Sequence, residues 1–263
     1  MSHRTEVLDA TPGSLASRIA HREQQHAPAT VAVMIGIVGL VIMSVVIVGL
    51  GLLLTHFLVH GPVGRWDEQV EDWFVTQRTS SWNAITSVGT TIGSTLTVLA
   101  VAIVTVAVLA LRKLWREIGL IVIALFVEVS TFLITTIIVN RPRPTVPQLD
   151  PSPPTSSFPS GHTAAAIALW ISLAIVITMH VRNRFVRVVV WIVAVGLPVF
   201  VSFSRLYRGM HHPTDVAGSL ILGTGAVVTA LLAVRAASAV HELRHARRPA
   251  GPALQPTRAG ATS

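Results

Sequence analysis

Residues 31–58 read VAVMIGIVGLVIMSVVIVGLGLLLTHFL, and this stretch decides the fold class of the chain. It contains no Asp, Glu, Lys or Arg. A membrane-spanning helix needs about 20 mainly apolar residues, whereas the apolar region of a signal peptide has only about 7–15. We therefore interpret the segment as a retained signal anchor. Five further apolar stretches have the length of a membrane span: 86–111, 118–139, 163–180, 187–204 and 216–234.

The composition also favours a membrane protein. Asp, Glu, Lys and Arg make up 12% of the 263 residues, against about 25% in an ordinary soluble domain. The absence of Cys excludes a disulfide framework, a zinc–thiolate site and a thiol nucleophile. The sequence predicts an all-α polytopic membrane protein, in which residues 31–235 form one six-transmembrane-helix bundle. We expect polar, poorly ordered cytoplasmic tails at 1–30 and 236–263, and a short interfacial helix over 65–82 after the first span.

The Lys and Arg residues orient the predicted bundle. With the N-terminus in the cytoplasm, most of the 20 Lys and Arg residues fall on cytoplasmic segments, as the positive-inside rule requires. Both termini are therefore predicted to be cytoplasmic. The formal net charge of +8 then belongs to the cytoplasmic face, where it meets anionic lipid headgroups, and it does not indicate a nucleic-acid partner.

Three polar stretches interrupt the apolar pattern. They are NRPRP at 140–144, FPSGH at 158–162 and SRLYRGMHHPTD at 204–215. The first follows the third predicted span, the second enters the fourth, and the third joins the fifth span to the sixth. Because odd-numbered spans run outward and even-numbered spans return, we expect all three stretches on the outer face.

Some residues of these stretches are suited to binding an anion. Arg143 and Arg205 can hold phosphate oxygens through their planar guanidinium groups. Ser160 and Gly161 open a predicted helix, whose first N–H groups and dipole favour an anionic ligand. Gly161 also allows the backbone to approach that ligand closely.

Other residues are suited to acid–base chemistry. Asp215 follows His211 by four positions, so that one helical turn brings its carboxylate toward the imidazole and fixes the tautomer. His162 supplies a second imidazole that can give or take a proton. The chain shows no carboxylate pair or His-rich set of the kind that binds a metal ion. We therefore expect phosphoryl transfer without a metal or other cofactor.

The three stretches resemble the signature motifs of the type 2 phosphatidic acid phosphatase family. This family also includes bacterial undecaprenyl-diphosphate and phosphatidylglycerophosphate phosphatases, and it shares its site with vanadium haloperoxidases. The motif Pro-Ser-Gly-His matches at 159–162, and Ser-Arg-x5-His-x3-Asp matches within 204–215. The motif Lys-x6-Arg-Pro matches only at 143–144, because Thr136 occupies the Lys position. Arg141 and Arg208 are candidates to replace the missing charge, whereas Thr136 itself can offer only a hydrogen bond.

The resemblance implies a mechanism. His211 would attack phosphorus and become a phosphohistidine, Asp215 would orient it, and His162 would protonate the leaving group. The residues that the resemblance assigns to the phosphoryl oxygens are Arg143, Ser160, Gly161 and Arg205.

The expected function is that of a metal-independent lipid phosphatase in a bacterial plasma membrane, with its active site on the outer face. The expected substrate is a phosphomonoester or diphosphate of a membrane lipid: undecaprenyl diphosphate first, then phosphatidylglycerophosphate or phosphatidic acid. Two alternatives stay open. One is a non-catalytic lipid-phosphate binder or transporter that uses the same anion site, and the other is a haloperoxidase-like enzyme with bound vanadate.

Two further residues attract attention. Glu128 lies inside the third predicted span, where an acid is either functional or a protonated structural group. Tyr207 is the single Tyr of the chain, and we expect it to anchor the protein at the membrane interface rather than to contact substrate.

Overall fold

The computed structural model describes residues 6–152 and 154–246. Within these residues the chain is all-helical, with nine α-helices, two short 3-10 helices and no strand, which confirms the predicted fold class. The α-helices are α1 (Leu15–Glu23), α2 (Pro28–His56), α3 (Pro62–Thr76), α4 (Ser80–Ile92), α5 (Thr95–Leu111), α6 (Trp115–Val139), α7 (Gly161–His180), α8 (Arg184–Tyr207) and α9 (Pro213–Ala246). The 3-10 helices are η1 (Glu6–Leu8) and η2 (Leu58–His60).

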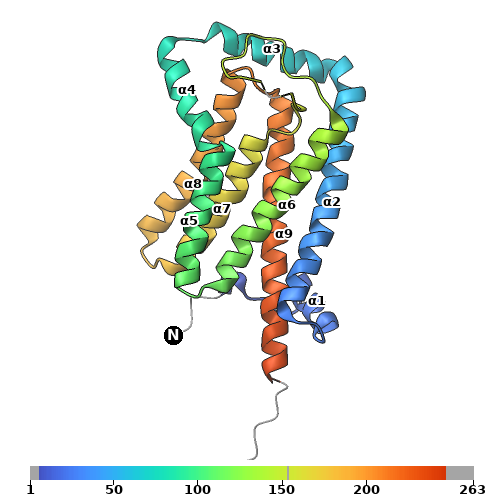
Figure 1. The fold of residues 1–263 in the computed structure, drawn as a ribbon, viewed down its shortest axis with the longest axis vertical. Coiled ribbons are helices and arrows are strands. Elements are labelled where there is room, and N and C mark those ends of the chain that lie inside the picture. Colours follow the sequence, from blue (N-terminus) through green and yellow to red (C-terminus); the bar gives the residue numbers. More distant parts are fainter. Residues whose placement is uncertain (1–5, 153, 247–263) are drawn as a thin grey trace, which may run out of the picture.

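The long helices run side by side along the molecule, and α3 lies across one end of the bundle (Figure 1). Five helical segments are long and apolar enough to cross a membrane: α2 continued by η2, α6, α7, α8 and α9. The bent pair α4–α5 is a sixth if it is counted as one span. The chain is therefore a multi-pass membrane protein, and α3 occupies the predicted position of the short helix after the first span.

The prediction of one continuous helix over 86–111 is wrong. The structure contains two helices here, α4 and α5, which are bent by 47° at a break. Ser94 begins a new helix because its hydroxyl accepts a hydrogen bond from the Thr97 N–H. Gly93 lies against its neighbours so closely that an added Cβ would come within 2.6 Å of Val201 Cγ1. Apolar length alone does not reveal such a break.

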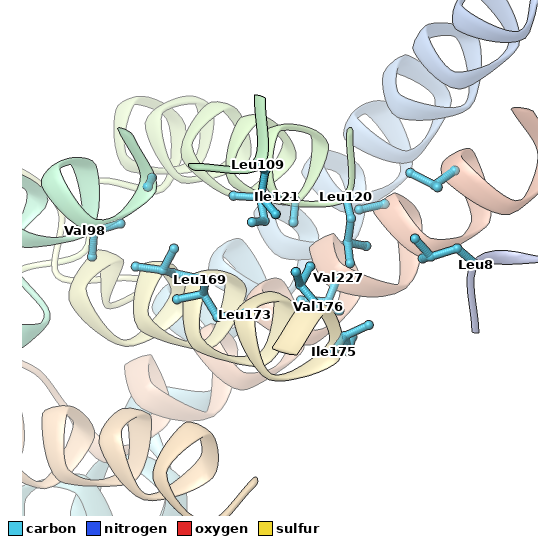
Figure 2. Packing of buried hydrophobic residues seen from close by; sticks show 14 residues of the cluster. Leu8, Val98, Leu109, Leu120, Ile121, Leu169, Leu173, Ile175, Val176 and Val227 are labelled. Atoms are coloured by element: carbon cyan, nitrogen blue, oxygen red, sulfur yellow. The ribbon is translucent and has the colours of Figure 1, made fainter. Parts of the chain in front are cut away.

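Two of the three buried apolar clusters lie within the bundle of long helices, and the third also includes α1. Figure 2 shows the larger one, in which Val98 of α5, Ile121 of α6, Leu169 of α7 and Val227 of α9 meet. A second cluster joins α2 to the other side of α6 and α9 through residues such as Ile47. Lipid is as apolar as these side chains, so close packing rather than exclusion of water stabilises such contacts within a membrane.

The N-terminal segment differs from the expected disordered tail. Residues 6–26 fold against the end of the bundle that is opposite α3 (Figure 1). Leu8 is 1% exposed and joins the larger core cluster, and Ala20 of α1 packs with Val240 of α9. Helix α9 also continues through 236–246, beyond the predicted end of the membrane domain. The remaining parts of the two tails, 1–5 and 247–263, lie outside the described residues.

The expectation that Tyr207 anchors the protein at the membrane interface is wrong. Its side chain is 1% exposed and lies among Phe74, Trp82 and Phe203. The Tyr207 hydroxyl accepts a hydrogen bond from the Thr79 N–H at 2.9 Å. The hydroxyl also donates to Asn83 Oδ1 at 3.2 Å, so it is both donor and acceptor, which makes its burial favourable.

Glu128 is 1% exposed in the middle of α6. Its Oε2 atom has no hydrogen-bond partner among the residues that the structure describes. A charged carboxylate in this position would carry a large desolvation cost, so the contacts favour a neutral, protonated side chain.

Candidate active site

The three polar stretches meet at the end of the bundle that carries α3 (Figure 1). Asn140 ends α6 in a left-handed conformation with φ of 45°, which turns the chain away from the helix axis. The stretches are then tied together across the chain. The Ser157 N–H donates to the Arg141 carbonyl at 2.9 Å, and the Ser160 N–H approaches the Asp215 carbonyl at 3.5 Å.

His211 lies in the centre of this arrangement and is 3% exposed. Its Nδ1 atom is 2.8 Å from the Ser157 carbonyl oxygen and 3.5 Å from Asp215 Oδ2. Both neighbours can only accept hydrogen bonds, so Nδ1 carries the ring proton in the neutral form. The second ring nitrogen, Nε2, then keeps a free lone pair. This is the tautomer that a nucleophile or a base requires.

The charge state of His211 follows from its surroundings. Burial lowers the pKa of His211 to about 4, although the hydrogen bond and the negative charge of Asp215 act to raise it. The positive charges of Arg205 and Arg143 also lower the pKa. Arg143 donates to the carbonyl of Met210, the residue that precedes His211. His211 is therefore neutral at physiological pH.

Asp215 lies in the first turn of α9 and is fully buried. Arg141 Nη1 donates to its Oδ1 atom at 2.5 Å, and the His212 N–H donates to Oδ2 at 2.9 Å. The N-terminal end of a helix also favours a negative charge. The spacing of four residues predicted a contact between His211 and Asp215, and the structure contains it.

Arg143 and Arg205 each have a buried Nε–H group that is not used within the described residues. Arg143 Nη1 donates to the Met210 carbonyl at 2.8 Å, and Arg205 Nη1 donates to Asp150 Oδ2 at 2.9 Å. Their Nε atoms are buried and have no partner within residues 6–152 and 154–246. A buried donor without an acceptor is costly, and a guanidinium Nε–H commonly binds an oxyanion. Both arginines thus retain a donor suited to an anionic ligand.

The beginning of α7 contributes the second motif. Ser160 is buried, and it does not cap α7 with its side chain, so that the first N–H groups of the helix remain available to a ligand. An added Cβ on Gly161 would come within 2.8 Å of the Phe132 ring, so a larger residue does not fit there. The His162 ring lies within the electrostatic influence of His211, Arg205 and Arg143. The structure therefore brings residues of all three motifs together.

Asp150 is a site residue that the sequence interpretation missed. Its Oδ2 atom accepts hydrogen bonds from Arg205 Nη1 at 2.9 Å and Arg208 Nε at 2.8 Å, while Oδ1 accepts from Arg208 Nη2 at 2.6 Å. Burial acts to raise the pKa of the Asp150 carboxyl, but the hydrogen bonds from Arg208 and the charge of Arg205 hold it below its ordinary value. A carboxylate of the chain itself therefore lies between two arginines of the third motif.

The three candidates for the missing Lys are placed as follows. Thr136 donates its hydroxyl to the Leu133 carbonyl of its own helix at 3.0 Å. Arg208 directs Nη1 to the Asn83 carbonyl and its other two nitrogens to Asp150 and the Leu149 carbonyl. Arg141 is 4% exposed, and its guanidinium group is paired with the carboxylates of Asp67 and Asp215.

Helix α3 also contributes to the site, which the sequence interpretation did not foresee. Asp67 and Glu71 are 1% and 3% exposed, and they contact Arg141 and His212. The available signal was their spacing of four residues, which puts both on one face of a helix. Among the described residues, no group of three or more His, Cys, Asp or Glu is arranged to hold a metal ion.

Comparisons with known proteins show what the chain is similar to. Residues 118–239 match the model of the PAP2 superfamily. The undecaprenyl-diphosphatase BcrC of Bacillus subtilis (strain 168) is 41% identical over 99 residues, which are 36% of this chain and 45% of that protein. The undecaprenyl-diphosphatase of Sulfolobus acidocaldarius is 33% identical over 125 residues, which are 45% of this chain and 56% of that protein.

Two further similarities concern phosphatidylglycerophosphate enzymes of Bacillus subtilis. Phosphatidylglycerophosphatase B is 37% identical over 68 residues, which are 26% of this chain and 34% of that protein. The chain thus spans about half or less of the length of the curated relatives that it matches. The crystal structure of a transmembrane PAP2-type phosphatidylglycerolphosphate phosphatase shares its fold, with a TM-score of 0.59 and 22% identity over 80% of this chain and 98% of that one. The part of the chain that contains all three motifs, residues 118–239, is thus similar to the PAP2 superfamily.

Proposed function

We propose that this protein is a metal-independent lipid phosphatase that acts through a phosphohistidine on His211. The observation that carries the proposal is the state of His211: its Nδ1 faces only acceptors, so Nε2 is free, and the charges of two arginines act on the ring. A neutral imidazole next to a phosphate-binding group of arginines is suited to nucleophilic attack on phosphorus.

The first half of the proposed reaction forms the covalent intermediate. The phosphoryl group of the substrate is held by Arg143, Arg205 and the first N–H groups of α7. His211 Nε2 attacks phosphorus, the bond from phosphorus to the leaving oxygen breaks, and His162 gives that oxygen a proton. Asp215 stabilises the positive charge that develops on the ring of His211.

The second half releases phosphate. His162, now without its proton, takes one from water, and the water oxygen attacks phosphorus. The bond between phosphorus and Nε2 then breaks, and His211 returns to its neutral form. Inorganic phosphate leaves, while the dephosphorylated lipid remains in the membrane.

We propose undecaprenyl diphosphate as the first substrate to test, with phosphatidylglycerophosphate and phosphatidic acid next. The relatives support this choice, because their names include undecaprenyl-diphosphatases and a phosphatidylglycerophosphatase. We further propose that the protein lies in a bacterial plasma membrane with its active site on the outer face. The concentration of Lys and Arg on the segments opposite the site supports this orientation.

The test is phosphate release by the purified protein in detergent with EDTA present, using these three lipids. Wild type is compared with His211→Ala and with the control His60→Ala, whose side chain is exposed near the same end of the bundle. We expect release that survives EDTA, is kept in His60→Ala and is lost in His211→Ala. If the folded protein binds the lipids but releases no phosphate, the proposed enzyme function is wrong and the protein is a lipid-phosphate binder.

A further inference from the structure

Helix α3 presents two different faces. Trp66 and Trp73 are 52% and 56% exposed, as expected for the outer side of a helix that lies at a membrane interface. Asp67 and Glu71, four residues apart, are buried against the active site. Their neighbours Glu68 and Asp72 are exposed. A buried carboxylate requires charged or hydrogen-bonding partners, so the question is what these two acids hold.

Asp67 holds a segment on each side of the site. Its Oδ2 atom accepts hydrogen bonds from Arg141 Nη2 at 2.9 Å and from the Thr214 hydroxyl at 2.6 Å. Its Oδ1 atom accepts from the Thr214 N–H at 3.0 Å. Arg141 uses its other terminal nitrogen, Nη1, to donate to Asp215 Oδ1. The planar guanidinium thus connects the carboxylate on α3 to the carboxylate beside His211.

Glu71 holds His212 in a similar way. Glu71 Oε1 is 2.5 Å from His212 Nδ1, and the Pro142 carbonyl is 3.1 Å from Nε2. Both ring nitrogens therefore face acceptors, which only the doubly protonated imidazolium can satisfy. The backbone N–H of His212 donates to Asp215 Oδ2 at 2.9 Å. Each oxygen of Asp215 is thus connected to α3 through one intermediate residue.

We propose that Asp67 and Glu71 are positioning residues, which fix Asp215 and thereby the ring of His211 for attack on phosphorus. This inference rests on the proposed function. Through Arg141 and His212, the two acids fix both oxygens of Asp215, so its carboxylate cannot turn away from the imidazole. The group also contains three carboxylates and two cations. Its one excess negative charge matches the positive charge that the His211 ring gains when Nε2 is phosphorylated.

The first test compares charge-neutral variants on the two faces of α3. Asp67→Asn and Glu71→Gln are measured beside the matched controls Asp72→Asn and Glu68→Gln, which remove the same charges from the exposed face. We expect kcat for lipid phosphate release to fall by about 100-fold in the first pair, the scale associated with a displaced catalytic group. KM and the inhibition constant of orthovanadate should change by less than about threefold, since Arg143 and Arg205 are untouched.

The second test is the pH profile of kcat in Glu71→Gln. The charged groups that face His212 are Glu71 from α3, Asp215 from α9 and Arg141 from the loop after α6. Burial and Arg141 act to lower the pKa of His212, but the hydrogen bond to Glu71 and the charge of Asp215 raise it above its ordinary value. Without the Glu71 charge this pKa falls, so the imidazolium is lost at a lower pH.

The alkaline limb of the kcat profile should therefore move to lower pH in Glu71→Gln and stay in place in Glu68→Gln. A role of Glu71 in stability alone would lower the unfolding temperature and leave the limb where it is. The Gln side chain keeps an oxygen that can accept from the His212 Nδ1–H, so this variant is expected to fold. If Asp67→Asn does not fold, the profile of Glu71→Gln decides the inference, and Asp67→Glu should recover part of kcat.

The outcomes separate the two proposals. If wild type releases no phosphate, or His211→Ala still does, the proposed function fails. If wild type is active and His211→Ala is inactive, but Asp67→Asn and Glu71→Gln match their controls in kcat and pH profile, the positioning role is wrong while the function stands.

Discussion

At the scale of single residues, the state of His211 leads to a prediction about pH. The nucleophile must be neutral, and burial lowers the pKa of His211 to about 4. Activity that depends on this group is present above that pKa and is lost as the pH falls through it. The profile of kcat/KM should therefore show an acid limb near pH 4 that is common to two lipid substrates. A common limb near pH 6.5, the ordinary value for a histidine, would contradict the burial of the ring.

Asp150 leads to a second prediction at this scale. Its carboxylate accepts hydrogen bonds from Arg205 and Arg208, so a phosphate that binds Arg205 competes with it. Asp150→Asn should lower the unfolding temperature of the free protein, because a buried guanidinium loses its charged partner. It should also increase the stabilisation by orthovanadate, since the ligand replaces the missing charge. Thermal unfolding with and without vanadate measures both effects, and Asp72→Asn, on the exposed face of α3, is the control. A vanadate shift no larger than that of wild type would show that Asp150 does not compete with the anion.

The motif residues could be located from the sequence because their spacing is local. His211 and Asp215 are four residues apart, and the contact between them follows from the geometry of one helical turn. Asp67 and Glu71 could not be found in this way. Glu71 meets His212 across a separation of 141 residues, and only the packing of α3 across the end of the bundle brings them together.

At the scale of elements, the break between α4 and α5 packs against His162 through Gly93. An added Cβ on Gly93 would lie 2.6 Å from Val201 Cγ1 and 3.2 Å from His162 Cβ. Gly93→Ala should therefore displace His162 and lower kcat by about 10- to 100-fold, the range expected when a proton donor is misplaced. The double variant with Val201→Ala removes the closest contact and should recover much of the loss. Gly196→Ala is the control, since nothing lies within 4 Å of its added Cβ.

A Gly93→Ala variant with the kcat of wild type would show that the break merely joins two helices. Recovery by Val201→Ala distinguishes displacement of His162 from a general loss of stability, because a Val→Ala change in a packed region otherwise lowers stability further. The measurement is steady-state phosphate release at saturating lipid, together with the unfolding temperature of each variant.

Most of the spans could be predicted because apolar length is a strong signal. The predicted spans 118–139 and 163–180 differ from α6 and α7 by at most three residues at either end. The break within 86–111 was missed because the Ser94 cap and the close approach at Gly93 are tertiary features within an apolar stretch. The tail 1–30 was also wrong in part, because its buried Leu8, Ala16 and Ala20 are too few to give a clear apolar pattern.

At the scale of the whole molecule, all three motifs lie at one end of the bundle, and α1 lies at the other (Figure 1). The orientation in a membrane can be tested cleanly because the chain has no Cys. His60 is exposed near the site, and Arg182 is exposed in the connection between α7 and α8 at the opposite end. We expect a membrane-impermeant maleimide to label His60→Cys in intact cells and to label Arg182→Cys only after the membrane is permeabilised.

The physical basis of this prediction is the distribution of charge along the bundle. Arg182 lies in the connection, and Arg184 and Arg187 follow it in the first turn of α8. Such clusters remain in the cytoplasm during insertion. At the site end, arginines such as Arg141 and Arg205 are paired with carboxylates, so they contribute little net charge to that surface. Labelling of Arg182→Cys but not His60→Cys in intact cells would place the site in the cytoplasm. The substrate phosphate would then have to be presented at the inner leaflet, and a role in recycling a carrier lipid at the outer leaflet would be ruled out.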